Sequence, residues 1–379
     1  MRTPILLIAI AVRLAGQTPV DDQVKQTLHL IAGHQAGVSR LAPVAEATAQ
    51  VLLKGGSFYI CCGDNPWIAE ADSRAGGPIG LKVARTSAQV TGNSVVWVSY
   101  NQSTYKTFVT DLERMPPNTL TVAFGPKPES DMPKSVLWVD SLTPWNAPAN
   151  LALMGNVISL WSLAGETAAA TARAGKTMAF YQSAWLPGAN ERNGRYAGIT
   201  FHKRLPIMQP ADPGVLAGLY LESLATMAAA IAASELPTIR AVGRTMAERA
   251  ATGKPVSLVV TSHLLSGLAA TGNPLYRYES DPAKLAPKLS PADYVVSLGY
   301  SSLDADLFKA VHSKGASAAW ILASSVKPKD APTAQNLFID QHWDPGDAVV
   351  TAWAYDVPIL PPSGIAQLFV YELLLRAAL

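Results

Sequence analysis

A group of polar, uncharged side chains at positions 99 to 104 is the part of this sequence that most clearly suggests chemistry. The group consists of Ser99, Asn101, Gln102, Ser103 and Thr104, and it follows directly after the apolar run 95–98. Ligands of open α/β sheets bind in the crevice beyond the carboxyl ends of the strands, so hydroxyl and amide groups there suit an oxygen-rich ligand. The alternative is that these residues only cap the helix predicted to follow.

These residues belong to a pattern that recurs 200 positions further along the chain. The apolar run 58–62 aligns with 258–262, and 136–140 aligns with 336–340, while Tyr100 and Phe108 align with Tyr300 and Phe308. The offset stays constant over about eighty residues, which chance matches of apolar runs would not easily produce. The sequence therefore predicts a duplicated domain.

Each half contains the same order of predicted elements. In the first half an Ala-rich helical stretch over 41–53 precedes strands at 58–62, 95–99, 119–124 and 136–139. In the second half helices over 213–234 and 238–251 precede strands at 256–261, 294–298, 318–322 and 337–339. Continuous apolar strands that alternate with helices indicate a parallel sheet covered on both faces. We expect two doubly wound, flavodoxin-like α/β domains in tandem, over 21–175 and 211–379.

The intervening segment 176–210 has Gly, Pro, Asn and charged residues without sustained periodicity, which indicates a connection between the domains. Long ordered connections often carry function, so His202 in this segment is a candidate catalytic residue; a solvated linker is the alternative. Glu222 in the next predicted helix is a further candidate without a motif.

Composition excludes several classes of protein. With 49% hydrophobic and 15% charged residues the chain is globular, with a large core. Its 30 basic and 28 acidic residues are scattered, so a nucleic-acid partner is not expected. The adjacent Cys61 and Cys62 are expected to point to opposite faces of a strand and to form no disulfide. No Cys and His spacing suits zinc, and neither a metal nor a cofactor is expected.

The N-terminal residues 1–20 resemble an export signal. Arg2 precedes an apolar run over 5–12, and small residues follow at positions 15 and 16, although Arg13 interrupts the pattern. The run is too short to span a bilayer. The expectation is a periplasmic or secreted protein if this segment is a signal peptide, and a cytoplasmic one if it is a frayed helix.

Several stretches resemble the sugar isomerase (SIS) family. "KGGSFYICCGDN" at 54–65 looks like the helix, Gly-Gly turn and first strand of these domains, and "VVWVSYNQSTYKTF" at 95–108 looks like their second strand and Ser/Thr turn. "YVVSLGYSSLDADLFKAVHSKGA" repeats that pattern, and the tail from Gly346 is similar to the last strand and closing helix. Phosphoheptose isomerase is one protein with such a domain. The chain after residue 20 thus resembles two SIS domains in tandem, the arrangement of the isomerase half of glucosamine-6-phosphate synthase.

The resemblance implies that Ser/Thr turns hold the phosphate of a sugar, and N–H groups at helix N-termini favour such an anion. The matching residues are Ser99, Asn101, Gln102, Ser103 and Thr104 in the first half, and Ser262, His263, Ser301 and Ser302 in the second. The turn after the first strand departs from the family, because Asp64 places a carboxylate where phosphate would sit and repels it. His263 could bind the phosphate or transfer a proton; the alternative is a histidine that caps a helix or packs in the core.

Glu70 is the residue that matches the family's proton-shuttling base. In "AEADSRAGG" it lies four residues before Arg74, the spacing of the isomerase segment, although the approach to it from Gly63 is shorter here. A helix-face ion pair between Glu70 and Arg74 is the common alternative.

Three functions follow from these features. The favoured one is the binding of a carbohydrate derivative, a phosphosugar or amino sugar, with aldose–ketose isomerisation an open question resting on Glu70 and His202. The alternative is a catalytically inactive SIS-fold protein with a structural or partner-binding role. A homodimer is expected from the resemblance alone.

Overall fold

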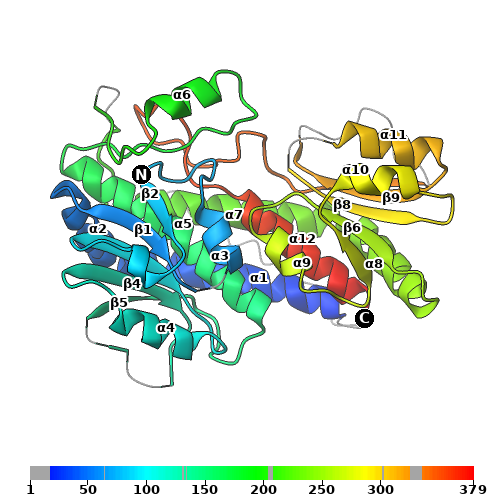
Figure 1. Cartoon of the computed structure of the whole chain (residues 1–379), viewed down its shortest axis with the longest axis horizontal. Helices are drawn as coiled ribbons and strands as arrows, with labels where there is room; N and C mark the ends of the chain where they lie inside the picture. Colours follow the sequence, from blue (N-terminus) through cyan, green and yellow to red (C-terminus); the bar gives the residue numbers. More distant parts are fainter. Residues whose placement is uncertain are drawn as a thin grey trace.

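The computed structural model describes residues 18–63, 65–129, 132–133, 135–203, 208–300, 303–324 and 335–379. It contains two five-stranded sheets, all of whose strand pairs are parallel. Helices flank both sheets (Figure 1). The fold is therefore α/β with two tandem domains, as the sequence predicts.

The first domain has the strand order β2-β1-β3-β4-β5. Its strands are β1 (Ser57–Cys61), β2 (Leu81–Ala84), β3 (Ser94–Ser99), β4 (Thr119–Gly125) and β5 (Val136–Asp140). Its helices are α2 (Ala42–Leu53), α3 (Asn65–Ala71), α4 (Tyr105–Glu113) and α5 (Ala149–Arg173). The central strand β3 is buried at every position, which explains its unbroken apolar sequence.

The second domain has the order β10-β9-β8-β6-β7, which is the same order counted from the other edge. Its strands are β6 (Val256–Val260), β7 (Tyr276–Glu279), β8 (Tyr294–Leu298), β9 (Ser317–Leu322) and β10 (Asn336–Asp340). Its helices are α8 (Leu236–Ala251), α9 (Leu265–Ala269), α10 (Pro282–Leu285), α11 (Ala305–Ser313) and α12 (Ser363–Ala377). The shared order agrees with the duplication inferred from the constant offset.

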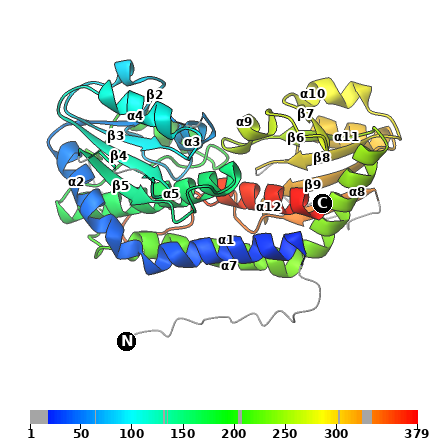
Figure 2. The same ribbon diagram turned by 90° about the horizontal axis from the view of Figure 1, so that it is seen from below.

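Two long helices, α1 (Pro19–Ala36) and α7 (Val215–Ser234), run side by side along both domains (Figure 2). Thr18 caps α1 in a capping box with Asp21. By length and composition α7 could cross a membrane; here it packs against α1 and α5, and 44% of its apolar window is buried. The short helix α6 (Ala189–Arg195) lies in the segment that connects the domains.

The core centres on α5 and α12, the helices that close the two domains. Residues 151–172 of α5 and 363–374 of α12 are buried throughout. These helices contact each other, and α12 also contacts α1 and α8. A helix that is apolar or small on all sides belongs inside a core, so the two domains share one interior.

The prediction for the two cysteines was wrong. The structure joins Cys61 and Cys62 in a disulfide between adjacent residues, and no free cysteine is found in the described chain. Strand alternation ends at Cys61, and Cys62 has a φ of 46°. That left-handed conformation turns its side chain away from the alternating direction assumed for a regular strand.

Candidate functional site

A buried polar network lies where the two domains meet, and it begins at α3. Glu70 occupies the last turn of this helix, and Arg74 follows in the loop beyond it. Arg74 Nε donates to Glu70 Oε1 at 3.2 Å, and Trp161 Nε1 of α5 donates to the same oxygen at 3.3 Å. Glu70 is 0% exposed and Arg74 2% exposed, so the pair is a buried ion pair rather than a solvated helix face.

The second domain contributes Tyr300, which follows β8, and His263, which follows β6. Arg74 Nη1 donates to the Tyr300 hydroxyl at 3.0 Å, and the His263 backbone N–H donates to the same oxygen at 2.8 Å. The His263 ring contacts the Ala69 carbonyl of α3 through Nδ1 at 3.2 Å. Helices α3 and α9, each following the first strand of its domain, therefore pack together (Figure 2).

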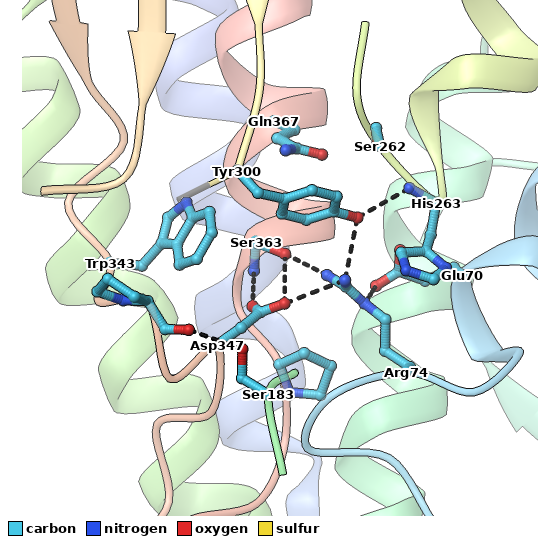
Figure 3. Close-up of polar contacts among 12 residues, drawn as sticks. Glu70, Arg74, Ser183, Ser262, His263, Tyr300, Trp343, Asp347, Ser363 and Gln367 are labelled. Carbon is cyan, nitrogen blue, oxygen red and sulfur yellow. Dashed lines mark hydrogen bonds and ion pairs between the residues drawn. The ribbon is translucent and has the colours of Figure 1, made fainter. Parts of the chain in front are cut away.

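The C-terminal segment completes the network (Figure 3). Arg74 Nη1 lies 3.0 Å from Asp347 Oδ2, and Nη2 donates to the hydroxyl of Ser363 at the start of α12. Ser363 in turn donates to Asp347 Oδ2 at 3.1 Å through its hydroxyl. A Cβ on Gly364 would lie 2.4 Å from Glu70 Oε1, so a residue without a side chain is required there.

Burial controls the electrostatics of this network. Burial raises the pKa of Glu70 and of Asp347, and the positive charge of Arg74 opposes that rise in both. Burial alone would lower the pKa of Arg74, but Asp347 and Glu70 raise it well above its ordinary value. One guanidinium thus faces two carboxylates inside the protein, and Glu70 Oε2 has no hydrogen-bond partner among the residues that the structure describes.

Other polar groups around the network are neutral or part of the core. Burial and the charge of Arg74 lower the pKa of His263 to about 4, so its ring is neutral at pH 7. Burial raises the pKa of the Tyr300 hydroxyl, which stays protonated. Trp343 packs edge-on against Tyr300 with ring centroids 6.0 Å apart (Figure 3). The network connects the domains and leaves Glu70 without contact to solvent.

The polar turn 99–104 lies at the carboxyl end of β3. The Asn101 Oδ1 atom accepts hydrogen bonds from the Ser103 hydroxyl at 2.7 Å and from the Thr104 N–H at 3.1 Å. The Thr104 hydroxyl accepts from the Asn101 N–H at 2.9 Å, and α4 begins directly afterwards at Tyr105. Gln102 and Ser103 are exposed. The turn is thus preformed, and its tip faces solvent.

Beneath the turn, the Ser99 hydroxyl is buried and has no hydrogen-bond partner in the described part of the chain. Gly63, after β1, approaches it so closely that a Cβ there would lie 2.4 Å from the Ser99 carbonyl oxygen and 3.1 Å from its hydroxyl. Asn156 of α5 donates to the Tyr100 carbonyl at 3.1 Å, and its Oδ1 also lacks a partner. Buried polar atoms without partners are uncommon in proteins, so this region is a candidate for ligand contact.

The predicted residues of the second domain are arranged differently. The Ser262 hydroxyl accepts from the Leu265 N–H at 2.9 Å, and its carbonyl accepts from the Ser266 hydroxyl, so Ser262 stabilises the start of α9. Ser301 and Ser302 lie outside the described residues, as does Asp64 of the first domain.

His202 and Glu222 lie in other parts of the molecule. His202 Nε2 is 3.3 Å from the Tyr355 hydroxyl, and its ring lies 4.3 Å from that of Tyr196. Glu222 lines an open groove of about 780 Å³ between α7 and the segment after β10, together with His342 and Asp344. Neither residue contacts the interdomain network, and the roles predicted for them stay predictions.

Sequence reasoning identified Glu70, Arg74 and His263 but missed Asp347 and Ser363 as members of the network. Asp347 has a φ of 46°, a conformation that Asp and Asn adopt more readily than most residues. The only sequence feature that pointed to Asp347 was the pair Gly346-Asp347 before the closing helix. In the described part of the chain no cluster of three or more His, Cys, Asp or Glu residues is placed to hold a metal ion.

Solved structures share this architecture. The C-terminal domain of glucosamine-fructose-6-phosphate aminotransferase from Francisella tularensis matches with a TM-score of 0.52 and 10% identity over 97% of this chain and 98% of that chain. A protein described as a phosphosugar isomerase from Silicibacter pomeroyi matches with a TM-score of 0.51 and 10% identity over 95% and 97% of the two chains.

A protein described as a sugar binding protein from Salmonella typhimurium matches with a TM-score of 0.51 and 12% identity over 95% of this chain and 98% of that chain. No family model and no curated protein sequence matches the chain. At these identities the likeness concerns the fold. The chain has the tandem SIS fold, as its repeated strand and turn pattern predicts.

Proposed function

We propose that this protein binds a carbohydrate derivative, a phosphosugar or amino sugar, at the turn 99–104 of the first domain. The observation that carries the proposal is the preformed turn itself: Asn101 organises it, Ser103 is exposed at its tip, and the buried Ser99 hydroxyl beneath it lacks a partner. Hydroxyl groups at a strand end and the start of α4 suit a sugar or its phosphate. Solved proteins of this fold include one described as sugar binding.

Binding without turnover is the form of the proposal that the network around Glu70 favours. A general base must reach the proton that it removes, to within about 3 Å or through one water. Glu70 is 0% exposed, bonded to Arg74 and Trp161, and covered by Gly364. In this closed arrangement the carboxylate holds Arg74, and Arg74 bonds to Tyr300, Asp347 and Ser363 of the second domain.

A thermal-shift titration of the whole chain tests the binding proposal. Probes are fructose 6-phosphate and glucosamine 6-phosphate, each compared with its unphosphorylated counterpart. A ligand of the native state raises the unfolding temperature in proportion to RT ln(1 + [L]/Kd), so a weak ligand is visible at high concentration. We expect at least one probe to stabilise the protein and Ser103→Ala to weaken that effect. Ser313→Ala, at an exposed site on α11, is the matched control.

Absence of any shift with all four probes contradicts the proposal, and so does a shift that survives both Ser103→Ala and Ser99→Ala. Under either outcome the alternative, a catalytically inactive protein with a structural or partner-binding role, becomes the better account.

Isomerisation is the second candidate, because Glu70, His263 and Tyr300 meet from both domains at the ends of β1, β6 and β8. It requires the network to open. Solvent deuterium incorporated at C1 of fructose 6-phosphate or at C2 of glucosamine 6-phosphate, and lost in Glu70→Gln while binding persists, would establish it. No incorporation by a protein that binds the sugar supports binding without turnover.

A further inference from the structure

A small cavity of about 140 Å³ lies in the first domain, apart from the turn 99–104 and the interdomain network. It is lined by the end of α1, the short 3-10 turn Val38–Leu41, the carboxyl end of β5 and the middle of α5, and it opens to solvent beside the exposed Arg40. Figure 2 shows α1, α2, β5 and α5 together at this end of the molecule. Its polar lining residues are His34, Arg40, Asp140 and Ser162.

Arg40 and Asp140 are the two oppositely charged residues in this lining, and they do not pair directly. No ion pair within 4 Å joins them in the described part of the chain, and no hydrogen bond is found there for the Arg40 guanidinium. They nevertheless act on each other: burial raises the pKa of Asp140, while the Leu142 N–H and the charge of Arg40 lower it. The two charges therefore face a common space that protein atoms do not bridge.

The position of Arg40 depends on its neighbour Gly37. A Cβ at Gly37 would lie 2.4 Å from Arg40 Nη2, so the absence of a side chain lets the guanidinium lie against the backbone at the end of α1. The nearby His34 does not add a second positive charge, because burial lowers its pKa to about 4. Its Nε2 lies 3.2 Å from the Ser141 carbonyl oxygen.

The Ser162 hydroxyl is the unexplained polar group of the cavity. Ser162 is 0% exposed, and its hydroxyl has no hydrogen-bond partner in the described part of the chain. Leaving a buried hydroxyl without a partner costs about 1–3 kcal/mol, so such groups normally meet a protein atom, a water or a ligand. Because Ser162 lines the cavity, an occupant of the cavity can supply that partner.

We propose that this cavity binds a small zwitterion, a free α-amino acid with a short side chain such as glycine or alanine. Its carboxylate faces Arg40, its ammonium group faces Asp140, and the Ser162 hydroxyl hydrogen-bonds to it. A simple anion would be repelled by Asp140 and a simple cation by Arg40, whereas a zwitterion satisfies both. A cavity volume of about 140 Å³ leaves room for a molecule of a few non-hydrogen atoms. Glycine and alanine are of that size.

The apolar part of the lining agrees with this assignment. Leu142 and Leu221 leave room for a hydrogen or a methyl group but supply no polar partner for a longer hydrophilic side chain. The cavity lies beside the carboxyl end of β5, whereas the proposed sugar site lies at the ends of β1 and β3. The two sites can therefore be tested independently.

Thermal-shift and calorimetric titrations of the full chain with five probes test the proposal: glycine, L-alanine, acetate, methylamine and inorganic phosphate. Acetate and methylamine each carry one half of the zwitterion. We expect glycine and L-alanine to bind, and each of the other three probes to bind weaker by about tenfold or more, equivalent to about 1.4 kcal/mol.

Variants separate the roles of the lining residues. Arg40→Gln is expected to abolish glycine binding and Ser162→Ala to weaken it several-fold. Asp140→Asn keeps an oxygen that can accept the Leu142 N–H, and it is expected to weaken glycine binding and improve acetate binding. Arg277→Gln, an exposed residue of β7, is the matched control and should bind glycine as the parent does. Circular dichroism confirms that each variant is folded.

Three outcomes would overturn the proposal. The first is no glycine binding at about 10 mM, a concentration at which even a millimolar ligand stabilises the fold measurably. The second is acetate or phosphate binding as tightly as glycine, which indicates an anion site. The third is glycine binding that survives both Arg40→Gln and Ser162→Ala, which places the ligand elsewhere.

Discussion

Tyr100 and Tyr300 follow the equivalent strands β3 and β8 in the two halves of the repeat, but their hydroxyl groups have different partners. Tyr100 points into its own domain, where its hydroxyl donates to the Pro126 carbonyl at 2.8 Å and its ring stacks on Phe108. Tyr300 points to the domain interface, where its hydroxyl accepts from Arg74 and from the His263 backbone. The turn after β3 is exposed to solvent at its tip, whereas Tyr300 after β8 contacts the other domain.

This difference shows that equivalent positions in the two halves of a duplicated fold can have different roles. Both halves present polar residues at the carboxyl ends of their strands, as the fold dictates. In the second half Ser262 caps α9, and His263 and Tyr300 join the network around Arg74, while Ser301 and Ser302 lie outside the described residues. In the first half Gln102 and Ser103 of the turn are exposed. The proposed ligand site lies in the first half, whereas Tyr300 and His263 of the second half contact Arg74 and α3 of the first.

Removing Arg74 should have the largest effect on this arrangement. Arg74→Met leaves the carboxylates of Glu70 and Asp347 buried without their counter-charge, and breaking such a pair typically costs about 3–5 kcal/mol. Urea unfolding followed by circular dichroism measures the loss. Arg195→Met removes an exposed pair with Glu191 and should change stability by less than about 1 kcal/mol. Equal losses in the two variants would mean that the network does not hold the domains together.

The response to acid should be the next largest effect. Burial lowers the pKa of His34 from 6.5 to about 4, so the native state holds the ring neutral where the unfolded chain would protonate it. The resulting stability is complete above pH 6.5 and is lost as the pH falls towards 4, by on the order of 3 kcal/mol. His263 contributes in the same direction.

Glu70 and Asp347 act with the opposite sign. Burial raises the pKa of both carboxyl groups, so the native state favours their protonated forms. Their contribution to the stability of the native state is therefore complete below their ordinary pKa values of 4.5 and 3.8, and it is lost as the pH rises. Unfolding midpoints between pH 7 and 4 should therefore fall less steeply in His34→Gln than in the parent, with exposed His29→Gln as the control. An unchanged slope in His34→Gln would contradict the assignment.

Close packing against Glu70 gives a smaller effect. Gly364→Ala would place a methyl group 2.4 Å from Glu70 Oε1, and relieving such overpacking costs about 1–3 kcal/mol. Gly218→Ala on α7 has open space around it, and it should be neutral or stabilising by up to about 1 kcal/mol, because alanine favours the helix. Thermal unfolding of the two variants compares them directly. If Gly364→Ala unfolds at the same temperature as the parent, α12 does not fix the position of Glu70.

Most of the architecture could be predicted from the sequence because its information is local. Buried parallel strands are continuous apolar runs, and the constant offset between the halves identifies the duplication. The edge strands β2 and β7 were missed because "LKVA" and "YRYE" are short, partly exposed and not uniformly apolar. The Cys61–Cys62 disulfide was missed because it depends on a left-handed residue at the strand end.

The interdomain network was only partly predictable. The spacing of Glu70 and Arg74 predicted an ion pair on a helix face, and the structure has the pair with Arg74 in the loop after α3. Tyr300 and Ser363 contact Arg74 across 226 and 289 residues of sequence, and these contacts depend on how the two domains pack. Local patterns contain no information about that packing, which is why the sequence predicts the Glu70–Arg74 pair but not the partners of Arg74 in the second domain.

The two equivalent tyrosines give the smallest and most direct test. Tyr300→Phe removes an acceptor of a charged donor and leaves the His263 N–H without that partner, whereas Tyr100→Phe removes one bond to a carbonyl. Hydrogen bonds to charged groups contribute about 1.5–3 kcal/mol and neutral ones about 0.5–1.5 kcal/mol. Tyr300→Phe should therefore be less stable than Tyr100→Phe by about 1 kcal/mol in urea unfolding. If Tyr100→Phe were the less stable variant, the hydroxyl of Tyr100 within the first domain would stabilise the fold more than the hydroxyl of Tyr300 between the domains. That result would contradict the stabilising role assigned to the interdomain contact.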